Sequence, residues 1–363
     1  MSSLDDKLAT AKAKVPDTYN AGKTCKDLND FSYFFFREAR IHEMLENIKT
    51  NNGTNFKSMF SDCTSLTTIP QLNTSNGLNF AYMFGNSWKL TIIPQLDTSN
   101  GLNFSAMFIG CKSLTTIPQL NTSNGDNFNY MFAECTKLTA IPQLNTSNGN
   151  DFSNMFENCS KLTSIPSLNT ANGSNFNNMF KGCTALKTIP TLDTSNASSI
   201  NNVFYGCGSL ESIPSSFNTG KTTAMSATFA FCEKITTIPQ LDFSRCKTIT
   251  DLFFGCKKLV TVPQINSTNC TAFTNIFSGC TELTTVSFTI IKASISFLDS
   301  PKLDVFVLQE IVEALEVKTT VSSSYKLTLN PTSWDLLERV ISPPSGYSTW
   351  KEYITNYKKW TYA

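Results

Sequence analysis

Cysteine is the most conspicuous reactive side chain in this chain of 363 residues, which holds twelve cysteines and one histidine, His42. Nine of the cysteines recur at one position of a repeated pattern, namely Cys63, Cys111, Cys135, Cys159, Cys183, Cys207, Cys232, Cys256 and Cys280. Side chains at one position of stacked repeats point the same way, and disulfide geometry disfavours a bridge between such parallel neighbours. Because no CxxC pair or nearby histidine accompanies them, zinc is not expected. We interpret this ladder as small buried thiols.

Two cysteines outside the ladder, Cys246 and Cys270, occupy equivalent turn positions in successive copies of the pattern. They are the one pair for which a disulfide is worth testing, and the sequence leaves open whether they pair. Cys25 stands alone.

Catalysis would need groups that this sequence does not bring together. A single histidine excludes a Ser-His-Asp triad in the repeats and any multi-histidine metal site. Asp97, Asp193 and Asp242 replace Asn73 at one turn position, but they lie several repeats apart. No glycine-rich phosphate loop follows a strand. We therefore expect a protein that is not an enzyme and has no catalytic, cofactor or metal site.

Charge gives no indication of a polyanionic partner. The 29 basic and 28 acidic residues leave a net charge of +1, and charged residues make up 16% of the chain, below the usual quarter. Nucleic acid and anionic lipid are therefore not expected as partners. The segment 1–15 carries acids and lysines where a secretory signal is apolar, and no stretch is long enough for a membrane span. The sequence predicts neither export by that route nor membrane insertion.

The elements that would position any site form an internal repeat. NFKSMFSDCTSLTTIPQLNTSNGL begins at Asn55 and returns as NFAYMFGNSWKLTIIPQLDTSNGL at Asn79. Later copies begin at Asn103, Asn127, Asp151, Asn175, Ser199, Ala224, Thr248 and Ala272. The spacing between copies is constant except for one residue inserted near Ser216. This pattern predicts an α/β solenoid, a leucine-rich-repeat-like right-handed coil of about ten 24-residue repeats with parallel β-strands, capped at both ends.

Each copy has the same internal order of apolar and turn residues. Phe56, Met59, Phe60 and Cys63 have helical spacing and predict a short α- or 3₁₀-helix. Leu66 and Ile69 lie in a Thr-rich, β-prone run that Pro70 should end. An Asn-Gly pair then suits a turn with positive φ. Each coil should therefore be strand, turn, short helix, turn.

The motif Met59-Phe60-x-x-Cys63-x-x-Leu66 followed by Ile69-Pro70 resembles the BspA-type leucine-rich repeats. It is similar to the MFxxCxxL repeats of bacterial surface lipoproteins and phage fibre proteins, over residues 55–289. The usual LxxLxLxxN spacing is not followed, because proline comes after Ile69. The resemblance implies a scaffold for binding or adhesion, and it implies no chemistry.

The ends depart from the repeat, and we divide the chain into four segments. Residues 1–29 should hold a helix, either folded on the solenoid or acting as an arm that docks or forms a homo-oligomer. Residues 30–54 are a degenerate capping repeat, 55–291 the solenoid and 292–363 a C-terminal cap. This cap should contain three helices, over 304–316, near 334–340 and near 350–357. Its final WTYA resembles the C-terminal segments of phage repeat proteins.

Repeated polar side chains outside the core form the candidate binding face. They are Thr67, Thr91, Thr115, Thr139, Thr163, Gln71, Gln95, Gln119 and Gln143. Such ladders can hold the coils in register by hydrogen bonds, or they can offer a flat neutral surface to a partner.

Three functions compete on these observations. The first is a phage structural protein, a tail or head fibre, adaptor or decoration component in the virion, that contacts other virion proteins or a host-surface protein or glycan. The second is a bacterial or eukaryotic-microbe adhesin at the cell surface. The third, a glycan-processing enzyme, would need two carboxylates converging on one face.

Overall fold

The structure is a computed structural model that describes residues 29–35, 37 and 50–363. The chain forms two compact units, unit 1 (residues 1–173) and unit 2 (residues 174–363). The helix expected within residues 1–29, with its docking or oligomerising role, lies outside the described residues. So do Cys25 and His42.

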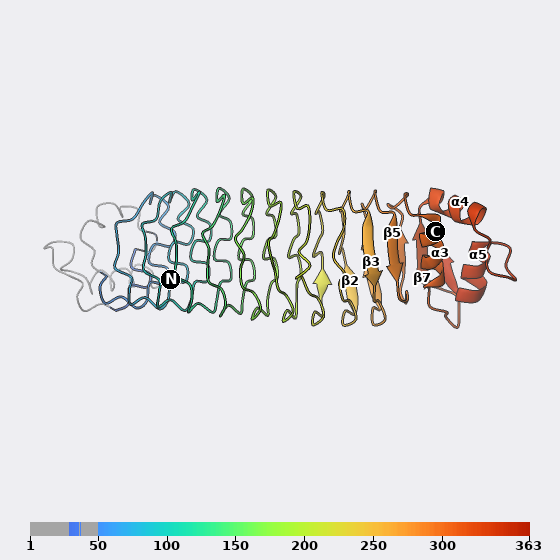
Figure 1. The fold of residues 1–363 in the computed structure, drawn as a ribbon, viewed down its shortest axis with the longest axis horizontal. Coiled ribbons are helices and arrows are strands. Elements are labelled where there is room, and N and C mark those ends of the chain that lie inside the picture. The colour runs from blue at the N-terminus through green and yellow to red at the C-terminus, as the bar shows by residue number, and fades with distance from the viewer. Residues whose placement is uncertain (1–28, 36, 38–49) are drawn as a thin grey trace, which may run out of the picture. The chain divides into compact units, whose positions relative to one another are not determined.

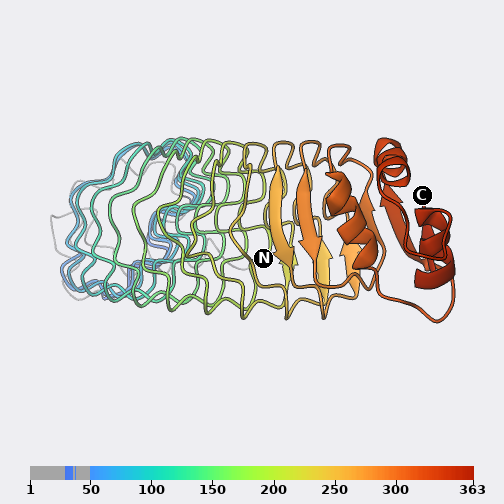
Figure 2. The same cartoon turned by 45° about the vertical axis from the view of Figure 1, so that its right-hand side comes forward.

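In unit 1 each copy of the repeat forms one coil, and successive coils lie side by side in the blue-to-green part of the ribbon (Figures 1 and 2). Parallel bridges join residues at the start of successive copies, Asn55 to Asn79, Asn79 to Asn103, Asn103 to Asn127 and Asn127 to Asp151. Each copy therefore advances the chain by one coil, which confirms the prediction of a parallel repeat solenoid.

The segment after each bridge is a ribbon of turns, and the predicted short helix is wrong. Alternate backbone N–H groups, such as those of Phe104 and Phe108, donate to carbonyls of the next copy. The N–H groups of Met107 and Cys111 instead donate to the carbonyls of Phe104 and Phe108, three residues earlier, at 3.2 and 3.1 Å.

Residues with left-handed backbone interrupt the helical path. Ala106 has φ 52° and Gly110 has φ 68°. An α-helix would use every interior N–H within its own segment, whereas this ribbon gives every second one to the adjacent coil. Coil-to-coil hydrogen bonding therefore overrides the helical spacing of the apolar residues.

Two columns of phenylalanine rings form the centre of unit 1. Phe60 and Phe84 stack with ring centroids 5.6 Å apart and planes 2° apart. The column continues through Phe108 and Phe132 to Phe156 at the same spacing. All of these side chains are buried. One phenylalanine per copy at a fixed position therefore produces a continuous core.

The glycine of the Asn-Gly turn is required for space, which corrects the expectation of positive φ. Gly125 is not among the residues with positive φ. A Cβ at this position would lie 2.8 Å from the ring of Phe104 and 2.9 Å from the ring of Phe128. These two rings stack on each other, with centroids 5.9 Å and planes 3° apart, and belong to the second phenylalanine column. The turn therefore packs its backbone directly on this second column.

Unit 2 continues the repeat with short labelled strands (Figure 1). Strands β1 (Met225–Ser226), β2 (Thr248–Thr250) and β4 (Ala272–Thr274) form one parallel sheet, and β3 (Thr261–Ile265) pairs in parallel with β5 (Thr285–Phe288). The proline expected to end the strand, Pro263, lies inside β3, where the register shifts between Val262 and Ile265. A proline has no N–H to give to the ladder, so pairing skips that position.

The end of unit 2 is a mixed α/β segment. Its elements are β6 (Ile295–Phe297), α3 (Val305–Glu313), β7 (Ser322–Leu329), α4 (Pro331–Val340), α5 (Trp350–Tyr353), the π-helical turn η1 (Ile354–Lys358) and β8 (Trp360–Tyr362). Asp304 caps α3 and Asn330 caps α4 by accepting hydrogen bonds from Phe306 and Thr332. In Figure 2 the orange helix α3 lies beside the strands of the last repeats.

The three expected C-terminal helices are present, but the parallel sheet β6-β7-β8 was not predicted. Ser322–Leu329 has the sequence SSSYKLTL, and only its two leucines are buried. So few apolar residues do not produce the alternating pattern by which a strand is predicted. At the start of α5 the Thr349 hydroxyl accepts from the Glu352 N–H at 3.0 Å, and the Glu352 carboxylate accepts from the Ser348 N–H at 2.8 Å.

Candidate functional site

Rows of polar side chains, one residue from each copy, form the candidate binding face of unit 1. All nine predicted residues are exposed. The threonine row lies between buried positions, since Leu66 and Ile69 on either side of Thr67 face the core. The three-residue spacing of the buried Leu66 and Ile69 therefore leaves Thr67 and Thr68 on the outside.

The threonine row is joined along the solenoid by its backbone. The Thr91 N–H donates to the Thr67 carbonyl at 2.9 Å, and the Thr91 hydroxyl donates to the same oxygen at 3.1 Å. Thr139 makes the equivalent pair of bonds to the Thr115 carbonyl, at 3.2 and 3.3 Å. These hydroxyls thus help to hold adjacent coils in register.

The glutamine row is joined through its side chains. The amide nitrogen of Gln71 donates to the Gln95 carbonyl at 2.6 Å, and that of Gln95 to the Gln119 carbonyl at 2.5 Å. Gln119 and Gln143 donate in the same way to Gln143 and Ser167, at 2.6 and 2.7 Å. Each amide N–H₂ is therefore bound within the solenoid, while the side chain remains exposed.

Together the two rows make a pre-ordered, uncharged surface. The glutamine side-chain oxygens and the threonine hydroxyls are the polar groups that it presents outward. A hydrogen bond to such a neutral group contributes on the order of 1 kcal/mol, so tight binding requires several coils at once.

Two exposed apolar side chains interrupt this surface in the second copy. Ile92 is 65% exposed and Trp88 48% exposed. Ile92 stands where neighbouring copies have Thr68 and Thr116. Sequence reasoning passed over both, although the loss of threonine at this position was the available signal.

The cysteine ladder is structural. The Cys135 thiol donates to the Phe108 carbonyl at 3.1 Å, and in the copy without cysteine the Ser87 hydroxyl donates to the Phe60 carbonyl at 2.6 Å. Burial raises the pKa of Cys135 to about 12. Such a thiol stays neutral and is a poor nucleophile or metal ligand. The interpretation as buried thiols is confirmed.

Cys246 and Cys270 are free thiols and form no disulfide. The Cys270 thiol donates to the Cys246 carbonyl at 3.2 Å, and the Cys246 thiol to the Thr222 carbonyl at 3.5 Å. Each of the two is therefore a rung of a second thiol ladder, and they do not pair.

The three turn aspartates hold their own turns. One oxygen of Asp97 accepts from the hydroxyl and the N–H of Ser99, at 2.7 and 3.0 Å, and these bonds lower the pKa of Asp97. Asp193 and Asp242 accept in the same way from the N–H groups of Ser195 and Ser244. Their recurrence thus has a local structural reason.

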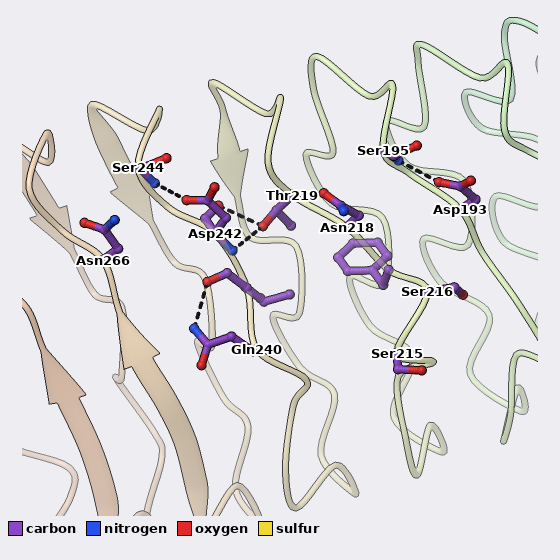
Figure 3. A pocket seen from close by; sticks show the side chains of 12 residues that line it. Asp193, Ser195, Ser215, Ser216, Asn218, Thr219, Gln240, Asp242, Ser244 and Asn266 are labelled. Carbon is purple, nitrogen blue, oxygen red and sulfur yellow. Dashed lines mark hydrogen bonds between the residues drawn. The ribbon is translucent and has the colours of Figure 1, made fainter.

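Two of these aspartates, Asp193 and Asp242, share one surface groove, although they belong to different copies of the repeat. Asp193 and Asp242 both line one surface groove of unit 2, with a volume of about 670 Å³ (Figure 3). They stand two copies apart, or roughly 10 Å at the usual spacing of adjacent strands. The expectation that the turn aspartates are scattered is therefore wrong for this pair.

Among the residues that the structure describes, no group of three or more His, Cys, Asp or Glu side chains could hold a metal ion. Within those same residues, no helix is long and apolar enough to cross a membrane.

The coils and exposed rows define a leucine-rich-type repeat solenoid. The family described as "Mycoplasma protein of unknown function, DUF285" matches residues 20–114, 86–191 and 174–288, and the chain belongs to this family. Its overlapping matches agree with the internal repeat and confirm the BspA-type resemblance.

Two solved structures are similar to the chain. A leucine-rich repeat protein from Bacteroides ovatus is 18% identical, with 69% of this chain and 72% of that chain covered and a TM-score of 0.40. A leucine-rich cell surface protein from Faecalibacterium prausnitzii is 17% identical, with 62% and 80% covered and a TM-score of 0.25. At these TM-scores the likenesses do not bear on function. No curated protein matches the chain.

Proposed function

We propose that this protein is a non-enzymatic binding module of a cell surface, which attaches to a host or matrix protein or a glycan. The observation that carries the proposal is the exposed threonine and glutamine rows of unit 1, which present the same neutral groups on coil after coil. Their hydrogen bonds to adjacent coils keep the rows ordered before any partner arrives, so binding loses less conformational entropy.

A binding role is favoured over catalysis by the state of the reactive side chains. The ladder thiols are buried and hydrogen-bonded to backbone carbonyls, as in Cys135 and Cys159. The turn aspartates each use one carboxylate oxygen to hold a serine N–H. The thiols and carboxylates that could take part in catalysis thus form hydrogen bonds that hold the coils together.

Family membership and the BspA-type repeats support the cell-surface adhesin ahead of the virion component. The virion interpretation rests on the end segments, namely the N-terminal helix and the final WTYA. The first of these lies outside the described residues, as does any homo-oligomer contact through it. We therefore adopt the adhesin.

The proposal includes a solenoid of about ten coils over residues 55–291, with both ends covered. At its start, Phe31 stacks on Phe56 with centroids 5.7 Å and planes 6° apart, which supports 30–54 as a capping repeat. At its end, Phe297 of β6 stacks on Phe277 at 5.2 Å and 18°. The segment 292–363 would thereby cover the last phenylalanine of the column, as terminal repeats must.

Two experiments test this function. Antibodies against the purified chain should label intact cells of the source culture without permeabilisation, and labelling only after permeabilisation would contradict a surface location. The purified chain, immobilised at high density, should retain host cells or matrix.

The binding face is tested by paired charge substitutions. A Thr115→Lys, Thr139→Lys double variant places two charges on the threonine row and should reduce retention at least tenfold. The matched control is Leu78→Lys, Leu102→Lys, because both leucines are exposed in unit 1 and belong to another row. Equal retention by the two double variants would contradict a role for the threonine row.

A further inference from the structure

A groove in unit 2 occurs where the repeat departs from its own rules. One residue is inserted near Ser216, in the copy that begins at Ser199. In that copy and the two before it, Ser215, Thr191 and Ser167 stand in place of the glutamine that follows Ile-Pro in the other copies. The long glutamine side chains of the other coils are therefore missing from three successive coils, and a groove of about 670 Å³ lies at the last of them.

The insertion is accommodated by ordered contacts, so the groove has a fixed shape. The Leu192 N–H donates to the Ser216 hydroxyl at 3.0 Å, and the Asn218 N–H donates to the Thr194 hydroxyl at 2.8 Å. Phe217 fills the widened core and packs against Phe204 with ring centroids 5.4 Å apart. Its exposure of 1% shows that it closes the floor of the groove and offers no stacking platform.

The lining is hydrophilic and carries negative charge only. Asp193 and Asp242 line it together with amides and hydroxyls, among them Asn218, Gln240 and Asn266 (Figure 3). No lysine, arginine or histidine is among the lining residues. The two apolar lining residues, Phe217 and Leu241, are buried, at 1% and 2% exposure.

The carboxylates are oriented by their turns. One oxygen of Asp242 accepts from the Ser244 N–H at 2.8 Å, and one oxygen of Asp193 from the Ser195 N–H at 2.9 Å. The second oxygen of Asp242 lies near Gly220, since a Cβ added to Gly220 would be 3.7 Å from it. A carboxylate held in this way accepts strong hydrogen bonds from hydroxyl donors.

From this lining we infer that the groove binds a neutral oligosaccharide. Its hydroxyls would donate to the Asp193 and Asp242 carboxylates and accept from the amides of Asn218 and Asn266. Anionic ligands are disfavoured because the lining contains two carboxylates and no lysine, arginine or histidine, and apolar peptide anchors are disfavoured because both apolar lining residues are buried. The volume lies within the roughly 300–1,000 Å³ of small-ligand sites.

This site belongs to unit 2, whereas the rows of the proposed function belong to unit 1, and it is tested on the purified chain without cells. A panel of uncharged di- to tetrasaccharides of hexoses and N-acetylhexosamines is titrated by calorimetry and by ligand-observed NMR. We expect binding of at least one panel member at millimolar concentration or below, unchanged by EDTA.

Two variants locate the binding, with one matched control. Asp242→Asn keeps the acceptor oxygen of the turn but removes the charge, and should weaken binding about tenfold, as expected for loss of a charge-assisted hydrogen bond. Ser215→Gln restores the side chain of the other copies, fills the groove and should abolish binding. Asp97→Asn makes the same change in an equivalent turn of unit 1 and should leave affinity unchanged.

Circular dichroism melting keeps these results interpretable, because all three variants should melt within a few degrees of the parent. The inference would be overturned if no member of the panel bound, or if EDTA removed the binding. It would equally be overturned if Asp97→Asn and Asp242→Asn lost the same affinity, or if Ser215→Gln still bound. Preference for an acidic glycan or a peptide over the neutral panel would also overturn it.

Discussion

Replacing Phe132 by alanine should reveal how much each ring of the phenylalanine column contributes to stability. Its side chain is fully buried, with 0% exposure. Its ring lies 5.6 Å from Phe108 on one side and 5.6 Å from Phe156 on the other, with planes 6° and 10° apart. Alanine would therefore leave a cavity between two rings that adjacent coils keep in place.

The magnitude follows from buried large-to-small substitutions. Phe→Ala changes in protein cores cost about 3–5 kcal/mol. Two aromatic contacts are lost as well, each contributing about 0.5–1.5 kcal/mol, partly within that range. The fixed coil spacing prevents the cavity from collapsing, so we expect a loss near the upper end, about 4–5 kcal/mol.

Urea unfolding of the full chain, followed by circular dichroism, measures the change in the free energy of unfolding. The control is Thr163→Ala, an exposed position in the next coil, which should change stability by about 0.5 kcal/mol or less. Because a solenoid can open coil by coil, amide hydrogen exchange should show lost protection concentrated in the coils flanking Phe132. If the two variants differ by less than about 1 kcal/mol, the stacked-column description is refuted.

Three further outcomes are expected. Burial raises the pKa of Cys135 from its ordinary 9.0 to about 12, so its stabilising contribution is complete below pH 9 and falls by about 1.4 kcal/mol per pH unit as the pH rises from 9 towards 12. Other buried thiols, such as Cys207 and Cys256, lose stability in the same range. Urea unfolding at pH 8 and 10.5 should therefore show a loss that is smaller in Cys135→Ser than in the parent by roughly 2 kcal/mol, and an equal loss in the two proteins would contradict this reasoning. Gly125→Ala should lower the free energy of unfolding by about 1–3 kcal/mol, because the new Cβ meets two rings. Gly208→Ala should melt like the parent, because the atom nearest to its Cβ would be 3.9 Å away. Similar melting temperatures for the two variants would refute the packing reason. Lys358→Met should cost about 2–3 kcal/mol in urea unfolding, since two backbone carbonyls that accept from its ammonium group at 2.8 and 2.7 Å lose their donor, and a neutral result would show that water replaces it.

Much of the fold could be predicted because the same apolar residues recur at the same positions in every copy of the repeat. Phe60, Leu66 and Ile69 recur at fixed positions, and a burial pattern that returns once in every copy requires stacked coils. The exposed positions of Thr67 and Gln71 followed from the same recurring pattern, because they lie between or beside the buried positions. The function of those rows could not be predicted in this way, since exposed side chains can either hold adjacent coils in register or bind a partner.

The local conformation could not be predicted from spacing. Phe56, Met59, Phe60 and Cys63 have the spacing of a helix face, but every second N–H of this segment bonds to the next coil. The choice depends on a neighbour one full copy away along the chain, which a local pattern does not contain. The same holds for Gly125, which packs against the ring of Phe104 at the other end of its own copy and against the ring of Phe128 in the next copy.

The groove shows this division most clearly. The sequence by itself determined the ingredients: an inserted residue near Ser216, three successive copies without the glutamine, and aspartates at positions 193 and 242. Only the tertiary structure decided that these features meet on one surface. Stacking converts a sequence separation of two copies into roughly 10 Å of space, so carboxylates that are distant along the chain can face one ligand.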